Sequence, residues 1–203
     1  LYGPPGTGKT AFALWVAREL GRPLLRRTYA ELASCWVGET EQNIARAFRE
    51  AQRAKAVLLI DEADSFFRSR ELSTRSWETT QVNEMLARLE NFEGVFFATT
   101  NLMRDFDEAA MRRFDWKVPF GFLRSEARLT LAKRYAEQFK LPWTKTAETL
   151  LSKLDKLTPG DFSAVARQAR FRPLRDADDW VGRLMAEEEA KTVNGPKNTI
   201  GFA

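Results

Sequence analysis

The hydrophobic pattern of the first 120 residues predicts several amphipathic helices. Between residues 10 and 20, apolar side chains recur at four-residue intervals, and the pattern stops at Gly21 and Pro23, as a helix would. Residues 40–54 again place their apolar side chains on one helical face, and so do residues 82–89. We therefore expect at least three helices in this part of the chain.

Short apolar runs lie between these helices and predict strands. Residues 56–60 and 95–98 are continuously apolar, which is typical of strands covered on both faces of a parallel sheet. Shorter strands are expected at residues 24–25 and 116–120. Strands that alternate with helices indicate βαβ units, so we predict an α/β fold with a parallel sheet flanked by helices.

After Gly121 the pattern changes to helices alone, with proline residues at the turns between them. The expected helices span residues 125–139, 146–156, 161–170 and 177–191. The last ten residues are polar and contain glycine and proline, which predicts a loosely held tail. The expected organisation is an α/β subdomain over residues 1–120, a small all-helical subdomain over 121–193, and a flexible tail over 194–203.

Composition narrows the chemistry that this chain can perform. The sequence has 203 residues, a net charge of +4 and scattered basic residues, so nucleic-acid binding is permitted but not signalled. It contains no histidine, which excludes histidine-based zinc sites and catalytic triads. The single Cys35 excludes an internal disulfide and suits a reducing, cytoplasmic compartment. No stretch approaches the ~20 apolar residues of a membrane span. Because Leu1 is not a methionine and a glycine-rich motif follows at once, we expect a strand to precede it.

The segment from Gly3 to Thr10 fits the full phosphate-loop pattern and is followed directly by a predicted helix. Glycines allow backbone N–H groups to turn toward phosphate oxygens, and the helix N-terminus adds its positive dipole end. Lys9 is expected to reach the β- and γ-phosphates, and the Thr10 hydroxyl to ligate Mg²⁺. The alternative is a glycine-rich turn without a ligand. The expected nucleotide-binding residues of this loop are Pro5, Gly6, Thr7, Gly8, Lys9 and Thr10.

Two adjacent acids, Asp61 and Glu62, end the apolar run at residues 57–60. Open α/β sheets bind ligands at the carboxyl ends of their strands, which is where these acids are expected to lie. Asp61 would hold the Mg²⁺ shell, and Glu62 would polarise the attacking water. Neighbouring residues of a strand point to opposite sides, which suits two distinct roles. A solvated strand end is the alternative, which the phosphate loop upstream disfavours.

With these residues in place, the sequence resembles the AAA family of ATPases, within the AAA+ superfamily. Residues 3–10 have that family's preferred form of the phosphate loop, and residues 60–64 resemble its second motif. Residues 98–101 look like its sensor segment, whose Asn101 would bond the water or the γ-phosphate. By itself Asn101 would be a turn residue at a strand end. The resemblance, which is to relatives with a single ATPase module, implies ATP and Mg²⁺ as cofactors. The compact helical tail indicates a bacterial origin, and whether the native protein has one ATPase module or two stays open.

Residues 106–115 are similar to the family's arginine-finger stretch, in which an arginine projects into the ATP site of a neighbouring subunit. The family often separates two arginines by a short spacer, whereas Arg112 and Arg113 are adjacent here. We predict Arg113 as the finger, and the role of Arg112 stays open. A pair of surface arginines is the alternative. The resemblance therefore implies a homo-oligomeric ring, expected to be a hexamer.

Trp36, Val37 and Gly38 resemble the pore loop of the katanin and spastin branches of the family. In those rings the aromatic residue faces a central channel and grips an extended polypeptide. An amphipathic indole on a glycine-hinged loop can grip many sequences without reading any one of them. The alternative is that Trp36 packs beneath its own loop.

In the helical part, residues 158–162 look like the start of the helix that closes over the nucleotide, where Gly160 would permit close backbone approach. No second sensing arginine is assigned there. The leading hypothesis is an ATP-hydrolysing ring that remodels or unfolds protein substrates through its pore. Two alternatives stay open: a nucleic-acid machine of the clamp-loader or helicase-loader type, and a nucleotide-gated binding switch without turnover.

Overall fold

The computed structural model describes residues 1–36, 38–67, 76–101 and 108–193. The predicted tail over 194–203 lies outside these described residues. Contacts divide the chain into two compact units. The first unit contains Leu1–Pro4 and Lys9–Phe120, and the second contains Pro5–Gly8 together with the chain from Gly121 onward.

The first unit is built on a parallel sheet in the order β1-β2-β3, with β1 at Leu24–Thr28, β2 at Val57–Asp61 and β3 at Phe96–Ala98. The central strand β2 is buried at every position, which explains its continuous apolar sequence. Beyond β3, Tyr2 forms isolated parallel bridges to Thr100 and Pro119. The predicted α/β fold with a parallel sheet is confirmed.

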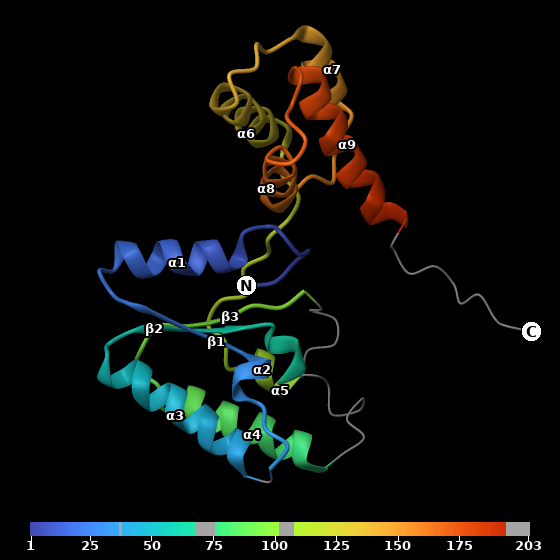
Figure 1. Ribbon diagram of the computed structural model, residues 1–203. Helices are drawn as coiled ribbons and strands as arrows, with labels where there is room; N and C mark the ends of the chain where they lie inside the picture. Colours follow the sequence, from blue (N-terminus) through green and yellow to red (C-terminus); the bar gives the residue numbers. More distant parts are fainter. Residues whose placement is uncertain (37, 68–75, 102–107, 194–203) are drawn as a thin grey trace, which may run out of the picture. The chain divides into compact units, whose positions relative to one another are not determined.

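Helices cover both faces of this sheet (Figure 1). The chain steps from β1 to β2 to β3 through α3 and α4, and these two helices lie on the same face. From Tyr2 the chain runs the other way across the sheet to β1, and α1 lies on the opposite face. Right-handed crossovers require this reversal of face. The helical segments of the unit are α1 (Lys9–Glu19), α2 (Tyr29–Leu32), α3 (Glu39–Arg53), η1 (Ala63–Ser65), α4 (Ser76–Glu90) and α5 (Glu108–Met111).

Alternate residues of β2 supply the two halves of the core. Leu58 and Ile60 join the apolar cluster that includes Phe48 of α3 and Met85 of α4. Val57 and Leu59 are equally buried and point to the opposite face of the sheet, which α1 covers. The side-chain layers on both faces therefore fix the plane of the sheet and the position of its carboxyl ends.

The second unit is helical in the part of the chain that the structure describes. Its helices are α6 (Ser125–Gln138), α7 (Lys145–Ser152), α8 (Pro159–Gln168) and α9 (Ala177–Val193). Trp180 of α9 is fully buried at the centre of the unit, with ring contacts to Tyr135, Phe139 and Phe162. These aromatic contacts hold α6, α8 and α9 together around one apolar core.

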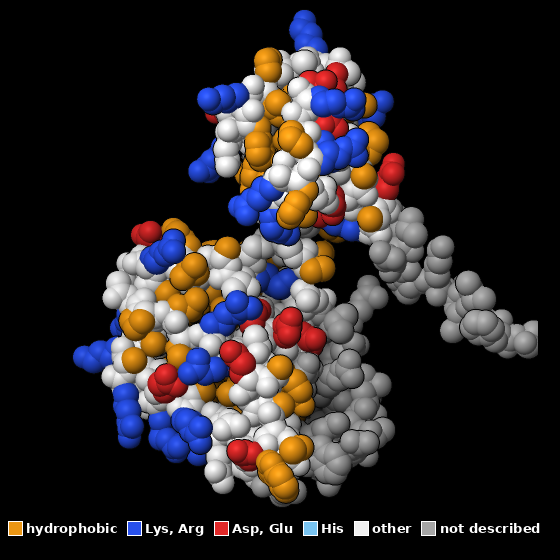
Figure 2. Space-filling model, in the orientation of Figure 1, with side chains coloured by type: hydrophobic (Ala, Val, Ile, Leu, Met, Phe, Trp, Pro, Cys, Tyr) orange, Lys and Arg blue, Asp and Glu red, His pale blue; other side chains and the backbone are white. Residues whose placement is uncertain are grey.

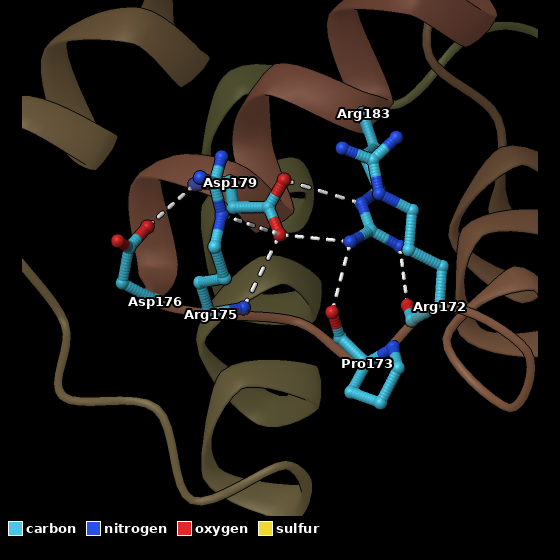
Figure 3. A network of polar contacts seen from close by, with 6 residues as sticks. All are labelled: Arg172, Pro173, Arg175, Asp176, Asp179 and Arg183. Carbon is cyan, nitrogen blue, oxygen red and sulfur yellow. Dashed lines mark hydrogen bonds and ion pairs between the residues drawn. The ribbon is translucent and has the colours of Figure 1, made fainter.

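A polar network fixes the entry into α9 (Figure 3). Arg183 pairs with Asp179 at 2.8 Å and also donates to the backbone oxygens of Arg172 and Pro173, at 2.7 and 3.0 Å. Asp179 accepts in addition from the backbone N–H of Arg175. Both partners of the ion pair are almost fully buried, with 12% and 9% of their side chains exposed. The network therefore anchors the loop between α8 and α9 to the second turn of α9.

Two expectations about strands differ from the structure. The strand expected at residues 24–25 continues to Thr28, because at the outer position of the sheet β1 can leave the side chains of Arg26 and Arg27 in contact with solvent. The strand expected at 116–120 is reduced to the single bridge between Pro119 and Tyr2. Proline has no N–H to donate to a strand ladder, which limits pairing at this position.

Candidate nucleotide-binding and catalytic site

The phosphate loop is folded by glycines with positive φ. Gly3, Gly6 and Gly8 have φ values of 136°, 77° and 97°. A Cβ atom on Gly3 would lie only 1.9 Å from the carbonyl oxygen of Phe120, so no other residue fits there. Between these glycines Pro5 is exposed and Thr7 is buried. Helix α1 begins at Lys9, directly after the loop.

Lys9 is 8% exposed, and its ammonium is held by three neutral oxygens. It donates to the backbone oxygens of Gly3 and Pro4 at 2.8 and 2.9 Å, and to Oδ1 of Asn101 at 2.8 Å. The pKa of Lys9 lies below its ordinary value, because the effect of burial outweighs the opposing attraction of Asp61 and Asp64. The three partners use all three donors of the ammonium but do not neutralise its charge. This arrangement favours an anion beside the loop.

Asp61 ends β2 and accepts bonds from three neighbouring elements. The Thr10 hydroxyl of α1 donates to Oδ2 at 3.1 Å, and Thr99, just after β3, donates to Oδ1. The guanidinium of Arg26 in β1 lies 2.8 Å from Oδ2. Asp61 is therefore fixed at the carboxyl edge of the sheet, where open α/β sheets bind ligands.

The oxygen donors at this edge suit a magnesium ion. Magnesium takes carboxylate and hydroxyl oxygens, and at nucleotide sites it is held by one or two protein groups together with phosphate oxygens. The Asp61 carboxylate and the Thr10 hydroxyl lie within hydrogen-bond distance of each other, so both could reach one ion. The donor set at Thr10 and Asp61 therefore fits the metal that the sequence led us to expect.

Glu62 does not lie on the strand, contrary to our expectation that Asp61 and Glu62 would alternate along β2. The strand ends at Asp61, and Glu62 has φ 58° and ψ 44°, a left-handed conformation that non-glycine residues rarely adopt. Its N–H donates to the Thr99 hydroxyl at 3.2 Å, and its side chain is exposed. The side chains of Asp61 and Glu62 therefore differ in direction because the backbone turns at Glu62, and not because the two residues alternate along a strand. Backbone strain of this kind concentrates at functional sites.

Asn101 follows β3, and its Oδ1 accepts a hydrogen bond from the Lys9 ammonium at 2.8 Å. Asn101 and Thr99 both follow β3. The Asn101 side chain contacts Lys9 of the phosphate loop, and the Thr99 hydroxyl contacts Asp61. The structure brings Lys9, Thr10, Asp61 and Asn101 together within the first unit. Their roles in binding and catalysis stay predictions.

Arg113 is an exposed residue just after α5, and its Nε lies 2.5 Å from Oε1 of Glu90 at the end of α4. The finger role requires a neighbouring subunit, so it stays a prediction. Arg112 is exposed as well. Exposure therefore does not show which of the two arginines would act as the finger.

Trp36 is 74% exposed, so the alternative that it packs beneath its own loop is wrong. The backbone N–H of Trp36 donates to the Ser34 hydroxyl, and its backbone oxygen accepts from the N–H of Glu39. These bonds tie the Trp36 backbone to the start of α3. Gly38 precedes α3 with φ 81°. Val37 lies outside the described residues. The loop therefore presents its indole to solvent.

The second unit holds residues Pro5–Gly8 against the start of α8. The N–H of Gly160 donates to the oxygen of Gly6 at 2.9 Å, and a Cβ on Gly160 would lie 2.8 Å from the Cα of Gly6. Asp161 accepts from both the N–H and the hydroxyl of Thr158, which caps the helix. Gly160 therefore makes a close backbone approach to Gly6 of the same unit. Its expected contact with the nucleotide stays a prediction.

Sequence reasoning missed Thr99 and Arg26. Thr99 bonds both Asp61 and the N–H of Glu62, and its position directly after an apolar run was the available signal. Arg26 reaches Asp61 through the pairing of β1 with β2, and this register is not visible in the sequence.

A parallel sheet with a lysine-containing glycine loop at its carboxyl edge defines a P-loop nucleotide-binding protein. Comparison with known protein families shows to which family of P-loop proteins this chain belongs. Residues 1–122 match the model of the ATPase family associated with various cellular activities, AAA, and the chain belongs to this family.

Two archaeal proteins are similar to nearly the whole chain. Protein SAV of Sulfolobus acidocaldarius is 35% identical over 196 residues, which cover 93% of this chain and 25% of that protein. Protein CdcH of Halobacterium salinarum is 33% identical over 202 residues, which cover 96% of this chain and 27% of that protein. The chain thus spans about a quarter of the length of these relatives.

Basic side chains form no continuous strip among the described residues of the face that Figure 2 shows. On the face shown in Figure 2, Lys and Arg side chains are interspersed with acidic and hydrophobic ones. Among the described residues, none of the helices combines the length and apolar character that crossing a bilayer requires.

Proposed function

We propose that this chain hydrolyses ATP to ADP and phosphate, with Mg²⁺ as cofactor. The single observation that supports this most is the cage around Lys9. A buried ammonium satisfied only by neutral oxygens keeps its charge available for phosphate oxygens, and the Thr10–Asp61 pair lies in the same unit. AAA family membership supports the same reaction.

In this proposal each residue at the sheet edge has one task. Lys9 leaves its loop oxygens and binds the β- and γ-phosphates, and Asn101 orients the attacking water or the γ-phosphate. The Glu62 carboxylate takes the proton of that water as general base. Thr10 and Asp61 would hold the Mg²⁺, which supplies neutralisation of the charge on the phosphates. On the sequence motifs alone, the backbone of Pro5–Gly8 and Gly160 is proposed to bind nucleotide as well.

Catalysis in this proposal also depends on a second copy of the chain. Arg113 would stabilise the transferring phosphoryl group in the site of the adjacent subunit, which requires a head-to-tail interface and a closed ring, expected to be a hexamer. Its exposed position just after α5 makes such a contact sterically accessible. The pair with Glu90 would then have to open when the ring forms.

The ring would act on a polypeptide held by Trp36. An indole that is 74% exposed at the entry to α3 can stack on many side chains without selecting a sequence. A protein substrate therefore fits the loop better than a nucleic acid, which the mild charge of +4 does not favour. Because Cys35 is an exposed free thiol, a reducing, cytoplasmic compartment suits the chain.

The experiment that tests this function is ATP turnover per subunit as a function of protein concentration, for the wild type and for Arg113→Ala. Arg88→Ala is the matched control, because Arg88 is also a partly exposed arginine paired with a glutamate, Glu84, at 2.7 Å. We expect turnover to rise with concentration, to fall at least a hundredfold in Arg113→Ala, and to stay unchanged in Arg88→Ala.

Three results would contradict parts of the proposal. Concentration-independent turnover that is equal in all three proteins would remove the finger and the ring. Tight ATP binding without turnover at any concentration would favour a nucleotide-gated switch. Salt-dependent binding to DNA with a slope of several phosphates would point to a nucleic-acid substrate.

A further inference from the structure

A positively charged residue from outside the recognised motifs contacts Asp61. The Arg26 guanidinium lies 2.8 Å from Oδ2 of Asp61, the same oxygen that accepts from the Thr10 hydroxyl at 3.1 Å. Thr99 occupies the other carboxylate oxygen, Oδ1. Asp61 is nearly buried, with 10% of its side chain exposed, whereas 54% of the Arg26 side chain is exposed.

The strand register explains why Arg26 reaches this carboxylate and Arg27 does not. Thr28 pairs with Asp61 across the parallel strands β1 and β2, so Arg26, two residues earlier, points to the same face of the sheet. Arg27 points to the other face and pairs with Glu50 of α3, also at 2.8 Å. The chain thus contains two adjacent arginines with the same ion-pair distance, only one of which contacts the expected metal ligand.

We propose that Arg26 is an internal cation that competes with the divalent metal for Oδ2 of Asp61 and thereby sets the Mg²⁺ concentration at which nucleotide binds. This inference rests on the proposed function. Arginine does not lose its proton in proteins, so the contact is broken only when the side chain moves away. Because more than half of that side chain is exposed, it can turn into solvent and leave Asp61 to the metal.

The proposal has two consequences of opposite sign. With Mg²⁺ present, removing the guanidinium removes a competitor, so less Mg²⁺ should be needed. Without Mg²⁺, the guanidinium neutralises Asp61 and limits its repulsion of phosphate oxygens, so removing it should weaken nucleotide binding. The ion pair has one largely exposed partner, so both effects should be about two- to fivefold. A residue with only a structural role would weaken binding under both conditions.

The test measures binding of a fluorescent ATP analogue to the full chain in EDTA and across a MgCl₂ series. Arg26→Met and Arg26→Gln remove the charge, Arg26→Lys keeps it, and Arg27→Met is the matched control. We expect Arg26→Met and Arg26→Gln to lower the half-saturating MgCl₂ concentration about two- to fivefold and to weaken binding in EDTA by a similar factor. Arg27→Met should match the wild type, and Arg26→Lys should lie close to it.

The outcomes separate this inference from the proposed function. If the wild type binds the analogue but the Arg26 variants match Arg27→Met at every MgCl₂ concentration, Arg26 does not compete with the metal. If the Arg26 variants bind more weakly both with and without MgCl₂, the residue has only a structural role. If the wild type does not bind the analogue under any condition, the proposed nucleotide site itself is wrong.

Discussion

The two units each contain a nearly buried cation, and their surroundings differ in charge. Arg183 of the helical unit pairs directly with the Asp179 carboxylate and donates to two backbone oxygens. Lys9 of the α/β unit donates only to neutral oxygens of Gly3, Pro4 and Asn101. The charge of Arg183 is therefore paired directly with a carboxylate, whereas Lys9 has only neutral hydrogen-bond partners and feels the charges of Asp61 and Asp64 without bonding either of them.

This difference separates a structural network from a candidate binding site. Hydrogen bonds alone would not distinguish the two cations, since both are well satisfied. An ion pair leaves little field for a ligand, whereas a cation in a cage of carbonyl oxygens still attracts an anion that can replace those oxygens. We expect mutations of Lys9 to change ligand binding and mutations of Arg183 to change stability.

The largest expected effect is on nucleotide binding in Lys9→Met. Hydrogen bonds to a charged group contribute about 1.5–3 kcal/mol each, so losing contacts to two phosphates should weaken ATP binding about a hundredfold or more. Titration with a fluorescent ATP analogue measures this effect. Arg183→Met is the control and should bind the analogue as the wild type does. If Lys9→Met keeps its affinity, the charge argument for this cage is wrong.

The next effect is on folding of Arg183→Met. This change leaves Asp179 buried without its main partner and removes two bonds to the loop oxygens of Arg172 and Pro173. We expect the free energy of unfolding to fall by about 2–4 kcal/mol. Urea unfolding followed by fluorescence measures it, because the buried Trp180 lies in the same unit. A loss no larger than that of Arg175→Met, whose side chain is 77% exposed, would contradict the structural role.

The smallest effect is on the pH dependence of stability. The hydrogen bonds from Arg183, aided by the N–H of Arg175, hold the pKa of Asp179 below its ordinary value of 3.8. A carboxyl group whose pKa is lowered by folding stabilises the protein above its unfolded pKa, and this contribution is lost as the pH falls through the folded pKa. Unfolding measured between about pH 5 and pH 2 should therefore show a loss of stability with acid that is shallower in Arg183→Met. If stability falls equally steeply with acid in both proteins, Arg183 does not lower the pKa of Asp179.

The sequence predicts the architecture well because hydrophobic periodicity reports burial. The continuous run in β2 indicates a strand covered on both faces, and the four-residue spacing in α1 and α3 indicates helices. The strand at β1 was predicted too short, since Arg26 and Arg27 interrupt its apolar pattern at the outer position of the sheet.

Contacts that depend on register or on backbone angles could not be predicted. The approach of Arg26 to Asp61 requires the pairing of Thr28 with Asp61, which no local pattern encodes. The left-handed conformation of Glu62 is equally invisible, because glutamate has no preference for positive φ. By contrast, the sequence did indicate that Gly160 permits a close backbone approach, but not that Gly6 is the partner.

The measurement that tests the central claim most directly compares ATP binding and ATP turnover in Glu62→Gln. The claim is that the sheet edge of this chain hydrolyses ATP with Glu62 as general base. Glutamine keeps the size of the side chain and its exposed position beside Asp61 but cannot accept the proton of water. We predict unchanged ATP binding with turnover reduced about a hundredfold or more. Turnover near that of the wild type would contradict the role of Glu62 and with it the mechanism proposed for this site.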